Sequence, residues 1–242
     1  MRERVRGLAG TYQGRRCFIM GNGPTLRDTD TRLLRDEVTI GSNGIFLFFD
    51  QMGYRPTFVT VEDRLVAEDR AAELNGIRGT TKIFPHDLTD CLRADADTLY
   101  VNFVRHYRGF PRFTAEFDRV AYWGGTVTFL NLQLAYYLGC RPIYLIGFDH
   151  NYSVPGAVES GPITSQSSDV NHFHPDYFGR GYRWNAPMLE RMETAYRAAR
   201  AFLESRGVEV FNATAGGRLE VFPRVNYQAV MGSDRALPPP GL

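Results

Sequence analysis

Short apolar runs alternate along the chain with segments in which apolar residues recur at helical spacing. Most of the apolar runs end in glycine or in polar residues, as strands that lead into loops do. This alternation is typical of an α/β domain with a mostly parallel sheet and helices on both faces, a Rossmann-like arrangement. The predicted strands are 16–20, 38–41, 57–61, 81–84, 98–103, 142–146 and 208–211, and the clearest predicted helices are 124–138 and 187–204.

One long polar stretch interrupts this alternation. Residues 150–185 are rich in Gly, Pro, Ser, His and Tyr, and a connection of this length inside a compact domain is usually a functional loop. We therefore expect a lid over a binding site. The sequence otherwise predicts a single α/β domain at 16–230, preceded by an N-terminal extension at 1–15. It ends in a disordered tail at 231–242, which contains three consecutive prolines.

Composition narrows the classes of function. The chain of 242 residues carries 28 basic and 27 acidic residues, a formal net charge of +1, so no global field favours a nucleic-acid partner. Lys82 is the only lysine, which leaves little for a P-loop or a Schiff-base mechanism.

The cysteines and the apolar runs bear on location. Cys17 and Cys140 lie in or beside apolar runs far from Cys91, which predicts buried free thiols and a reducing cytoplasm. No run of eighteen apolar residues predicts a membrane span. Peripheral attachment at the inner face of the membrane stays open.

The first strand is followed at once by a glycine turn, Gly21-Asn22-Gly23-Pro24-Thr25. Such a turn lets a phosphate or a ribose approach the backbone closely, and Asn22 adds an amide that donates and accepts hydrogen bonds. The third glycine of the dinucleotide fingerprint is absent at the required spacing. We interpret the turn as a nucleotide loop, with an ordinary strand-to-loop turn as the alternative.

Other strand ends carry polar side chains of the same kind. Ligands of open α/β sheets collect at the carboxyl ends of the strands. These ends hold Ser42 and Asn43 after the second strand, Glu62 and Asp63 after the third, and Gly147 and Asp149 after the strand at 142–146. The start of the helix at Gly124-Gly125-Thr126 is a second candidate anion site, because free backbone N–H groups point outward there. A plain helix entry is the alternative.

The predicted lid holds the titratable candidates. His172 and His174 lie within residues 171–177, and a histidine that titrates near neutral pH can remove a proton from a sugar hydroxyl. A metal site formed by this pair with Asp149, His150 or Asp176, and simple solvated histidines, are the alternatives. Hydroxyl groups that can donate to a departing phosphate are those of Tyr152, Tyr177 and Tyr182.

A basic aromatic segment, 104–113, has no regular period. It suits contact with an acceptor glycan, an anionic membrane surface or a phosphate, or else it is a loop whose aromatic rings cover the core.

In combination these motifs resemble the bacterial sialyltransferases of the Campylobacter type and the related proteins similar to hydroxymethylpterin diphosphokinase. The resemblance spans about residues 16–212 and rests on the GNGPT turn, Ser42-Asn43, the Gly-Gly-Thr helix start and residues 143–149. It implies that Asn22, Gly23 and Asn43 hold a cytidine nucleotide, which Gly124, Gly125 and Thr126 border. It also implies that Tyr152 contacts the phosphate and that His174 or His172 is the general base.

Two departures from the sialyltransferase pattern affect the donor. Those enzymes carry Thr-Ser-Gly where this chain has Gly-Gly-Thr, and an asparagine where this chain has Glu62-Asp63. Beside a nucleotide phosphate, Glu62, Asp63 and Asp149 would suit Mg²⁺, although Glu62 or Asp63 would also suit ribose hydroxyls without a metal.

The leading hypothesis is an inverting glycosyltransferase of polysaccharide biosynthesis. It would move an acidic sugar from a CMP-sugar donor to a glycan acceptor in a single displacement, with His174 as the general base and with no metal or other cofactor required. The alternatives are a Mg²⁺-dependent diphosphokinase that uses ATP and a non-catalytic module that binds a nucleotide or a glycan. We also expect a homo-oligomer.

Overall fold

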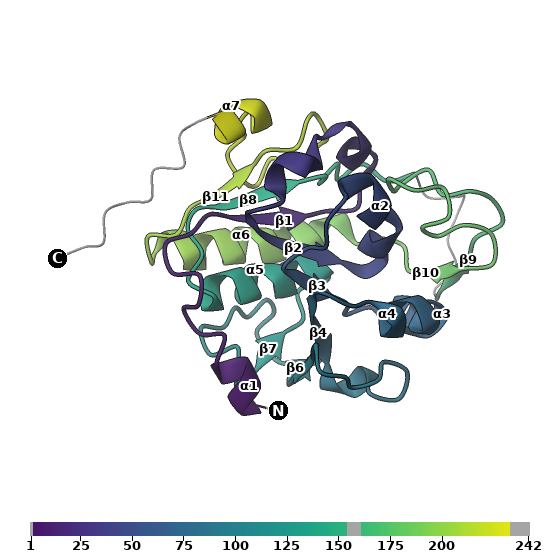
Figure 1. The fold of residues 1–242 in the computed structure, drawn as a ribbon, viewed down its shortest axis with the longest axis horizontal. Helices are drawn as coiled ribbons and strands as arrows, with labels where there is room; N and C mark the ends of the chain where they lie inside the picture. Colours follow the sequence, from purple (N-terminus) through teal and green to yellow (C-terminus); the bar gives the residue numbers. More distant parts are fainter. Residues whose placement is uncertain (1, 154–160, 233–242) are drawn as a thin grey trace.

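Seven short strands form one parallel sheet at the centre of the molecule (Figure 1). The computed structural model describes residues 2–153 and 161–232. All six pairings within the sheet are parallel, and the strand order is β11-β8-β1-β2-β3-β4-β5. The strands are β1 (Cys17–Met20), β2 (Val38–Ser42), β3 (Phe58–Thr60), β4 (Thr81–Pro85), β5 (Thr98–Val101), β8 (Ile143–Ile146) and β11 (Val210–Asn212). The predicted α/β architecture is confirmed.

Helices cover both faces of the sheet, which is why the strands are nearly continuous apolar runs. On one face α5 (Val127–Tyr137) lies between the sheet and α6 (Leu189–Glu204), so α5 is apolar on all sides. The amphipathic α6 turns one stripe of buried residues inward, from Met192 to Leu203. The other face is covered by η1 (Pro24–Asp28), η3 (Asn43–Phe48), α2 (Phe49–Met52), α3 (Arg64–Asp69) and α4 (Ala71–Gly76).

The remaining elements are short. Two further strand pairs lie outside the main sheet, one parallel and one antiparallel. They are β6 (Phe103–Val104) with β7 (Ala121–Tyr122), and β9 (Ile163–Thr164) with β10 (Arg183–Trp184). The other helical turns are α1 (Arg2–Arg6), η2 (Thr31–Leu34), η4 (His86–Leu88) and α7 (Tyr227–Gly232). The described residues contain no helix long and apolar enough to cross a membrane.

The N-terminal segment, predicted as an extension, packs onto the domain. The side chain of Val5 in α1 is buried in the core, and backbone N–H groups of Gly10 and Tyr12 donate to the carbonyls of Tyr137 and Leu138 at the end of α5, at 2.9 Å each. The predicted tail begins within α7, and residues 233–242 lie outside the described part of the chain.

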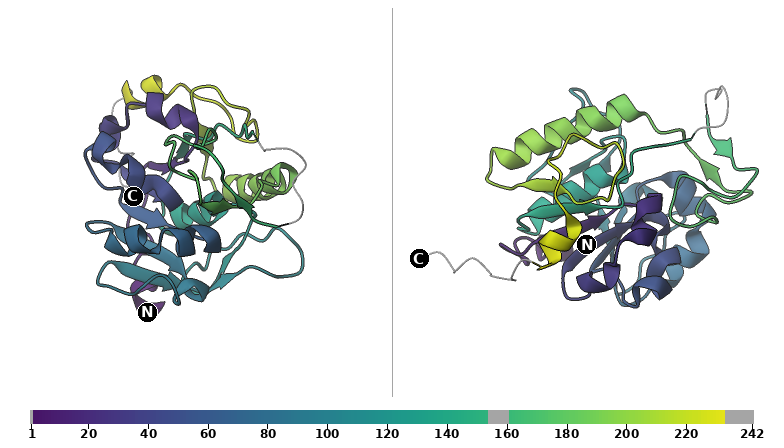
Figure 2. Two further views of the ribbon diagram at one scale, coloured as in Figure 1. Left: turned by 90° about the vertical axis from the view of Figure 1, so that its right-hand side faces the viewer. Right: turned by 90° about the horizontal axis from the view of Figure 1, so that it is seen from above.

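The segment predicted as a lid, residues 150–185, lies in the connection between β8 and α6. It contains the β9–β10 hairpin, and residues 154–160 lie outside the description (Figure 2). The prediction of buried free thiols is confirmed, since Cys17 and Cys140 are free and buried.

The order of the strands fixes where a ligand can bind. From β1 the chain proceeds through β2, β3, β4 and β5 on one side, whereas β8 and β11 lie on the other side of β1. Loops that leave adjacent strands in opposite directions open a crevice at the carboxyl ends of the strands. The crevice between β1 and β8 therefore lies directly at the glycine turn.

Because β1 and β8 approach closely at this point, we expect Gly21→Ala to destabilise the fold. A Cβ at Gly21 would overlap the backbone carbonyl of Gly147, which cannot rotate away as a side chain can. We expect a loss of about 2 kcal/mol or more in the free energy of unfolding and a fall of about 4–8 °C in Tm.

The matched control is Gly76→Ala in α4, where a Cβ meets no atom within 4 Å. Neither glycine has a positive φ, so neither variant is strained by its backbone conformation. Melting of both variants by circular dichroism checks this, and equal Tm values would contradict the close approach.

Candidate functional site

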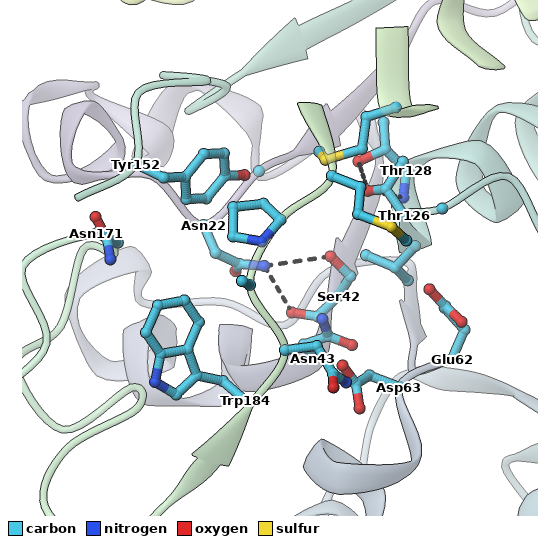
Figure 3. Close-up of a pocket in the computed structure, with 18 of the residues that line it drawn as sticks. Asn22, Ser42, Asn43, Glu62, Asp63, Thr126, Thr128, Tyr152, Asn171 and Trp184 are labelled. Carbon is cyan, nitrogen blue, oxygen red and sulfur yellow. Dashed lines mark hydrogen bonds between the residues drawn. The ribbon is translucent and has the colours of Figure 1, made fainter. Parts of the chain in front are cut away.

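A cavity of about 840 Å³ opens at the carboxyl ends of β1, β2, β3 and β8, beneath the lid (Figure 3). Most of the residues predicted from the sequence line it. These are Gly21, Asn22, Gly23, Ser42, Asn43, Glu62, Asp63, Gly125, Thr126, Gly147, Asp149, Tyr152, His172 and Tyr177. Predicted residues that do not line it are Pro24, Thr25, Gly124, His174 and Tyr182.

Asp149 fastens the glycine turn to the end of β8. Its carboxylate accepts hydrogen bonds from the Thr25 backbone N–H (3.3 Å) and from the Thr25 hydroxyl (2.8 Å), and the Gly23 N–H donates to the Gly147 carbonyl at 2.9 Å. A Cβ at Gly23 would overlap the carboxylate itself. Thr25 and Asp149 thus hold the turn in shape, and the glycine at position 23 is required by this contact.

The floor of the cavity carries asparagine amides with unused hydrogen-bonding capacity. The Asn22 amide donates to the carbonyl and hydroxyl oxygens of Ser42 at 3.2 and 3.3 Å (Figure 3). The Oδ1 atoms of Asn22 and Asn43 are buried without a partner. Such atoms cost free energy unless a ligand donates to them.

The backbone is strained at two positions of the cavity wall. Asn43 has φ 51° and His150 has φ 49°, and in the described residues they are the non-glycine positions with positive φ. Both line the cavity. Left-handed conformations of non-glycine residues cluster at functional sites.

The amino terminus of α5 opens onto the same cavity. The Thr126 hydroxyl caps the helix by accepting from the Thr128 N–H at 3.3 Å, and Gly125 has φ 81°. Gly124 packs against the Phe129 ring instead, which explains why it does not line the cavity. The helix was predicted from residue 124 but begins at Val127, because the two glycines form the turn that leads into it.

The predicted magnesium ligands do not assemble. Asp63 caps α3 by accepting from the Leu65 N–H (2.8 Å), and Glu62 lies against Arg105, with an Nη1–Oε2 distance of 3.1 Å. Asp149 is bound to Thr25. Residues 2–153 and 161–232 contain no group of three or more His, Cys, Asp or Glu side chains that could hold a metal ion. The three carboxylates are thus engaged in separate contacts within the chain, and a Mg²⁺ site formed by them stays a prediction.

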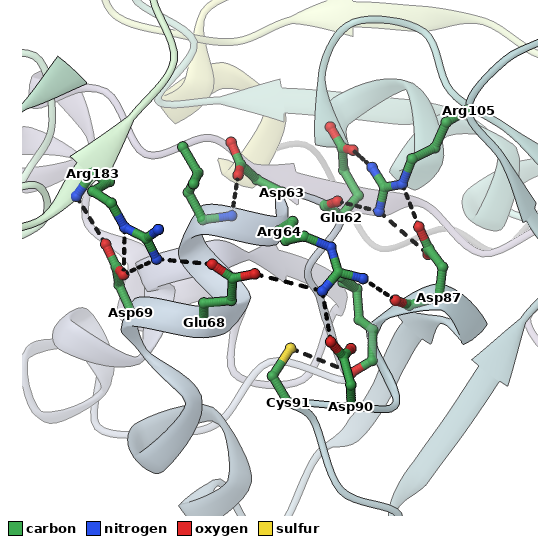
Figure 4. Close-up of polar contacts among 12 residues, drawn as sticks. Glu62, Asp63, Arg64, Glu68, Asp69, Asp87, Asp90, Cys91, Arg105 and Arg183 are labelled. Carbon is green, nitrogen blue, oxygen red and sulfur yellow. Dashed lines mark hydrogen bonds and ion pairs between the residues drawn. The ribbon is translucent and has the colours of Figure 1, made fainter. Parts of the chain in front are cut away.

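Glu62 is nevertheless unusual among these acids. Burial raises its pKa to about 7, although the neighbouring Arg105 lowers it in part. Arg105 also contacts Asp87 at 2.6 Å (Figure 4). The carboxyl of Glu62 is held inside the cavity wall by Arg105 and by a hydrogen bond from Trp123.

His172 has the geometry of an oriented base. Its Nδ1 lies 2.7 Å from the buried carboxylate of Asp169, and its ring stacks on Tyr177 with the centroids 4.0 Å apart and an angle of 4° between the planes. Burial raises the pKa of Asp169, but hydrogen bonds from His172 and from the backbone of Asn171 and Phe178 outweigh this and keep it below its usual range. With Nδ1–H directed to Asp169, Nε2 is left to accept a proton.

The other predicted lid residues take different places. His174 accepts a hydrogen bond from the Asp176 N–H at 3.1 Å, its side chain is 36% exposed, and it does not line the cavity. The Tyr177 hydroxyl accepts from the Gly44 N–H at 3.3 Å, so this tyrosine supports His172. Tyr152 lines the cavity, and burial raises its pKa, so its hydroxyl stays protonated and can donate.

Ion pairs and hydrogen bonds tie the lid to α3 and to the residue that follows it. Arg183 in β10 contacts Asp69 (Nε–Oδ1 2.9 Å) and Glu68 (Nη2–Oε2 2.9 Å) of α3 (Figure 4). Arg70, between α3 and α4, donates to the backbone carbonyls of Asp176 and Tyr177. These contacts position the segment that carries His172.

Several cavity residues escaped sequence reasoning. They include Asn171, Trp184 and Asn185 in the lid and Trp123 before α5, and Asp169, which contacts His172 from outside the lining, escaped it too. The one local signal was the spacing of Asp169 three residues before His172. Nothing in the sequence distinguished the two lid histidines, because their environments depend on the folding of the lid.

The chain is similar in sequence to one protein family and in fold to one solved glycosyltransferase. Residues 1–155 match the family described as MptE-like, 6-hydroxymethylpterin diphosphokinase MptE-like. No curated protein matches the chain. Among solved structures, the chain is similar to the MAf glycosyltransferase from Magnetospirillum magneticum AMB-1, with a TM-score of 0.56 and 16% sequence identity. The match covers 94% of this chain but 38% of that one, and at this identity it shows a shared fold.

The raised pKa of Glu62 predicts a pH dependence of stability. Between the unfolded pKa near 4.5 and the folded pKa near 7, the native state binds more protons than the unfolded state. Stability contributed by protonated Glu62 is therefore complete at low pH and is lost as pH rises through about 7. Glu62→Gln, which imitates the protonated form, should be more stable than the wild type by about 3 kcal/mol at pH 8 and equal to it at pH 4 to 5. Urea unfolding across this range measures the difference, and a pH-independent difference would contradict the assignment.

Proposed function

The chain belongs to the 6-hydroxymethylpterin diphosphokinase MptE-like family, and from this premise we propose that it is a transferase of one particular kind. It is a glycosyltransferase that moves an acidic sugar from a CMP-sugar donor to a glycan acceptor with inversion. The observation that carries the proposal is the low positive charge and high amide content of the cavity lining.

The cavity is suited to a donor with few charges. Five asparagines line it: Asn22, Asn43, Asn151, Asn171 and Asn185. Its two arginines are both paired with carboxylates, Arg64 with Asp90 (2.8 Å) and Arg105 with Glu62. The single lysine, Lys82, is buried in the core against Asp95 at 2.5 Å.

A nucleoside triphosphate needs unpaired cations or metal ions around its phosphates. The single phosphate of a CMP-sugar needs less positive charge around it. Asparagine amides can also donate hydrogen bonds to, and accept them from, the cytosine base and the sugar hydroxyls. The amino terminus of α5, with about half a positive charge, lies in the wall to receive that phosphate.

In the proposed reaction His172 is the general base. The acceptor hydroxyl oxygen forms a bond to the anomeric carbon of the donor, and the bond from that carbon to the phosphate oxygen breaks. CMP leaves with the bonding electrons, and the hydroxyl proton moves to Nε2 of His172. Asp169 holds the ring in the required tautomer through Nδ1. The Tyr152 hydroxyl and the first N–H groups of α5 stabilise the charge that develops on the leaving phosphate.

The family description favours a second candidate, a diphosphokinase that uses ATP. Such an enzyme needs Mg²⁺, and the acidic residues of the cavity do not fit this ion: Asp149 binds Thr25, and Glu62 binds Arg105. The diphosphokinase is therefore the second candidate function.

The two lid histidines give a matched test of the base. With CMP-sialic acid as donor and a galactoside as acceptor, His172→Ala should lower kcat about 100-fold or more, because proton transfer loses its acceptor. His174→Ala, which changes a side chain that does not line the cavity, should keep near wild-type kcat. Released CMP is measured. Normal turnover by His172→Ala, or an equal loss in both variants, would remove His172 from this role.

Ligand binding distinguishes the two candidate functions without an acceptor. We expect CMP to raise Tm in the absence of a divalent metal, by about 5–10 °C at a concentration 100 times Kd. ATP with Mg²⁺ should have little effect. Stabilisation by ATP with Mg²⁺, and none by CMP, would favour the diphosphokinase and contradict our proposal.

A further inference from the structure

Three arginines without acidic partners lie near the lining of the cavity, two in the loop that carries the lining residue His106 and one beside the lining residue Gly125. Arg108 and Arg112 lie in the exposed loop between β6 and β7, and Arg191 lies in the first turn of α6. In the part of the chain that the structure describes, no carboxylate lies within 4.0 Å ion-pair range of these three guanidinium groups, whereas Arg64 and Arg105 in the cavity lining and Arg183 in the lid are paired.

Aromatic contacts join the loop to α6 and fix this arrangement. The Arg191 guanidinium lies over the rings of both Phe110 and Trp123, at 4.4 and 4.5 Å from their centroids. Arg112 lies over the Tyr122 ring at 5.6 Å. A guanidinium held by aromatic faces is fixed in place while its N–H groups remain available to an anion.

Exposed apolar side chains adjoin the same rim. Met188, which lines the cavity, is 51% exposed, and the next residue, Leu189, is 38% exposed. Trp123 and His106 also line the cavity from the side of the loop. Figure 2 shows that α6 starts on the side of the molecule where the β9–β10 hairpin lies. We call this surface the rim patch: Arg108, Arg112, Arg191, Phe110, Met188 and Leu189.

We propose that the rim patch binds the surface of an anionic phospholipid bilayer. Unpaired arginines supply attraction to lipid phosphates, and neighbouring apolar side chains enter the interface, the combination found in peripheral membrane binding. Aromatic rings between them suit the level of the headgroups. A bound bilayer would lie at the mouth of the cavity, so an acceptor glycan carried on a lipid would enter directly from the membrane.

The test is flotation of the purified full chain with vesicles of phosphatidylcholine alone and of phosphatidylcholine with phosphatidylglycerol. We expect binding to the anionic vesicles that weakens as salt is raised. Each arginine near an anionic surface contributes about 1 kcal/mol, or about fivefold in the partition coefficient, so R108E/R112E should lower it about 25-fold or more. M188S/L189S should weaken binding and leave the salt dependence in place.

The control is R93E/R141E, which has the same net charge. Arg93 and Arg141 are exposed and precede β5 and β8, at the opposite ends of the strands from the cavity. Thermal melting confirms that each variant is folded. Equal binding to neutral and anionic vesicles, or an equal loss in R93E/R141E and R108E/R112E, would overturn the proposal. Because the readout is vesicle binding, it is independent of whether CMP binds or sugar is transferred.

Discussion

The close contact between the glycine turn after β1 and the end of β8 is the constraint on which the site depends. Gly21 and Gly23 have no side chains, so the turn reaches the backbone of Gly147 and the carboxylate of Asp149. Thr25 then closes the contact with two hydrogen bonds to Asp149. Larger side chains in the turn would push β1 and β8 apart where the crevice forms. The amides of Asn22 and Asn43 would then no longer lie together at the bottom of the cavity. The carboxylate of Asp149 thus has a structural role, because it holds the glycine turn in place.

Charge pairing inside the wall determines what the cavity can accept. Arg105 contacts Glu62 and Asp87, and Arg64 contacts Asp90, so guanidinium groups that would otherwise attract polyphosphate are neutralised by their neighbours. What remains available is the amide lining, the start of α5 and the Tyr152 hydroxyl. These groups suit one phosphate and several hydroxyls. In the rim patch, by contrast, the arginines have no acidic partners. We therefore expect the cavity to favour a single phosphate and the rim patch to favour a surface of many phosphates.

The lid carries His172, the base that we propose, and the position of this residue depends on contacts with elements far away in the sequence. Arg183 ties the lid to α3, Arg70 ties it to the turn between α3 and α4, and the Tyr177 ring, held by the Gly44 N–H, supports the imidazole of His172. Asp169 completes the support from within the lid. The contacts of the lid with α3, with Arg70 and with Gly44 all depend on the folded domain. The lid sequence alone therefore does not show which of its histidines faces the cavity.

The sequence by itself determined the architecture and most of the floor of the site. Apolar runs of strand length predicted the strands of the parallel sheet, because strands covered on both faces carry no polar residues until they end. The polar residues at those ends, from Asn22 to Asp149, were predicted to meet because carboxyl ends of parallel strands share one edge. Only the tertiary structure decided the rest. It showed that Glu62 and Asp149 have partners within the chain, since Arg105 and Thr25 come from distant segments that the fold brings to them. It placed His172 in the cavity and His174 outside it, because the path of a long polar connection is set by the surfaces it packs against, and no periodicity records those contacts.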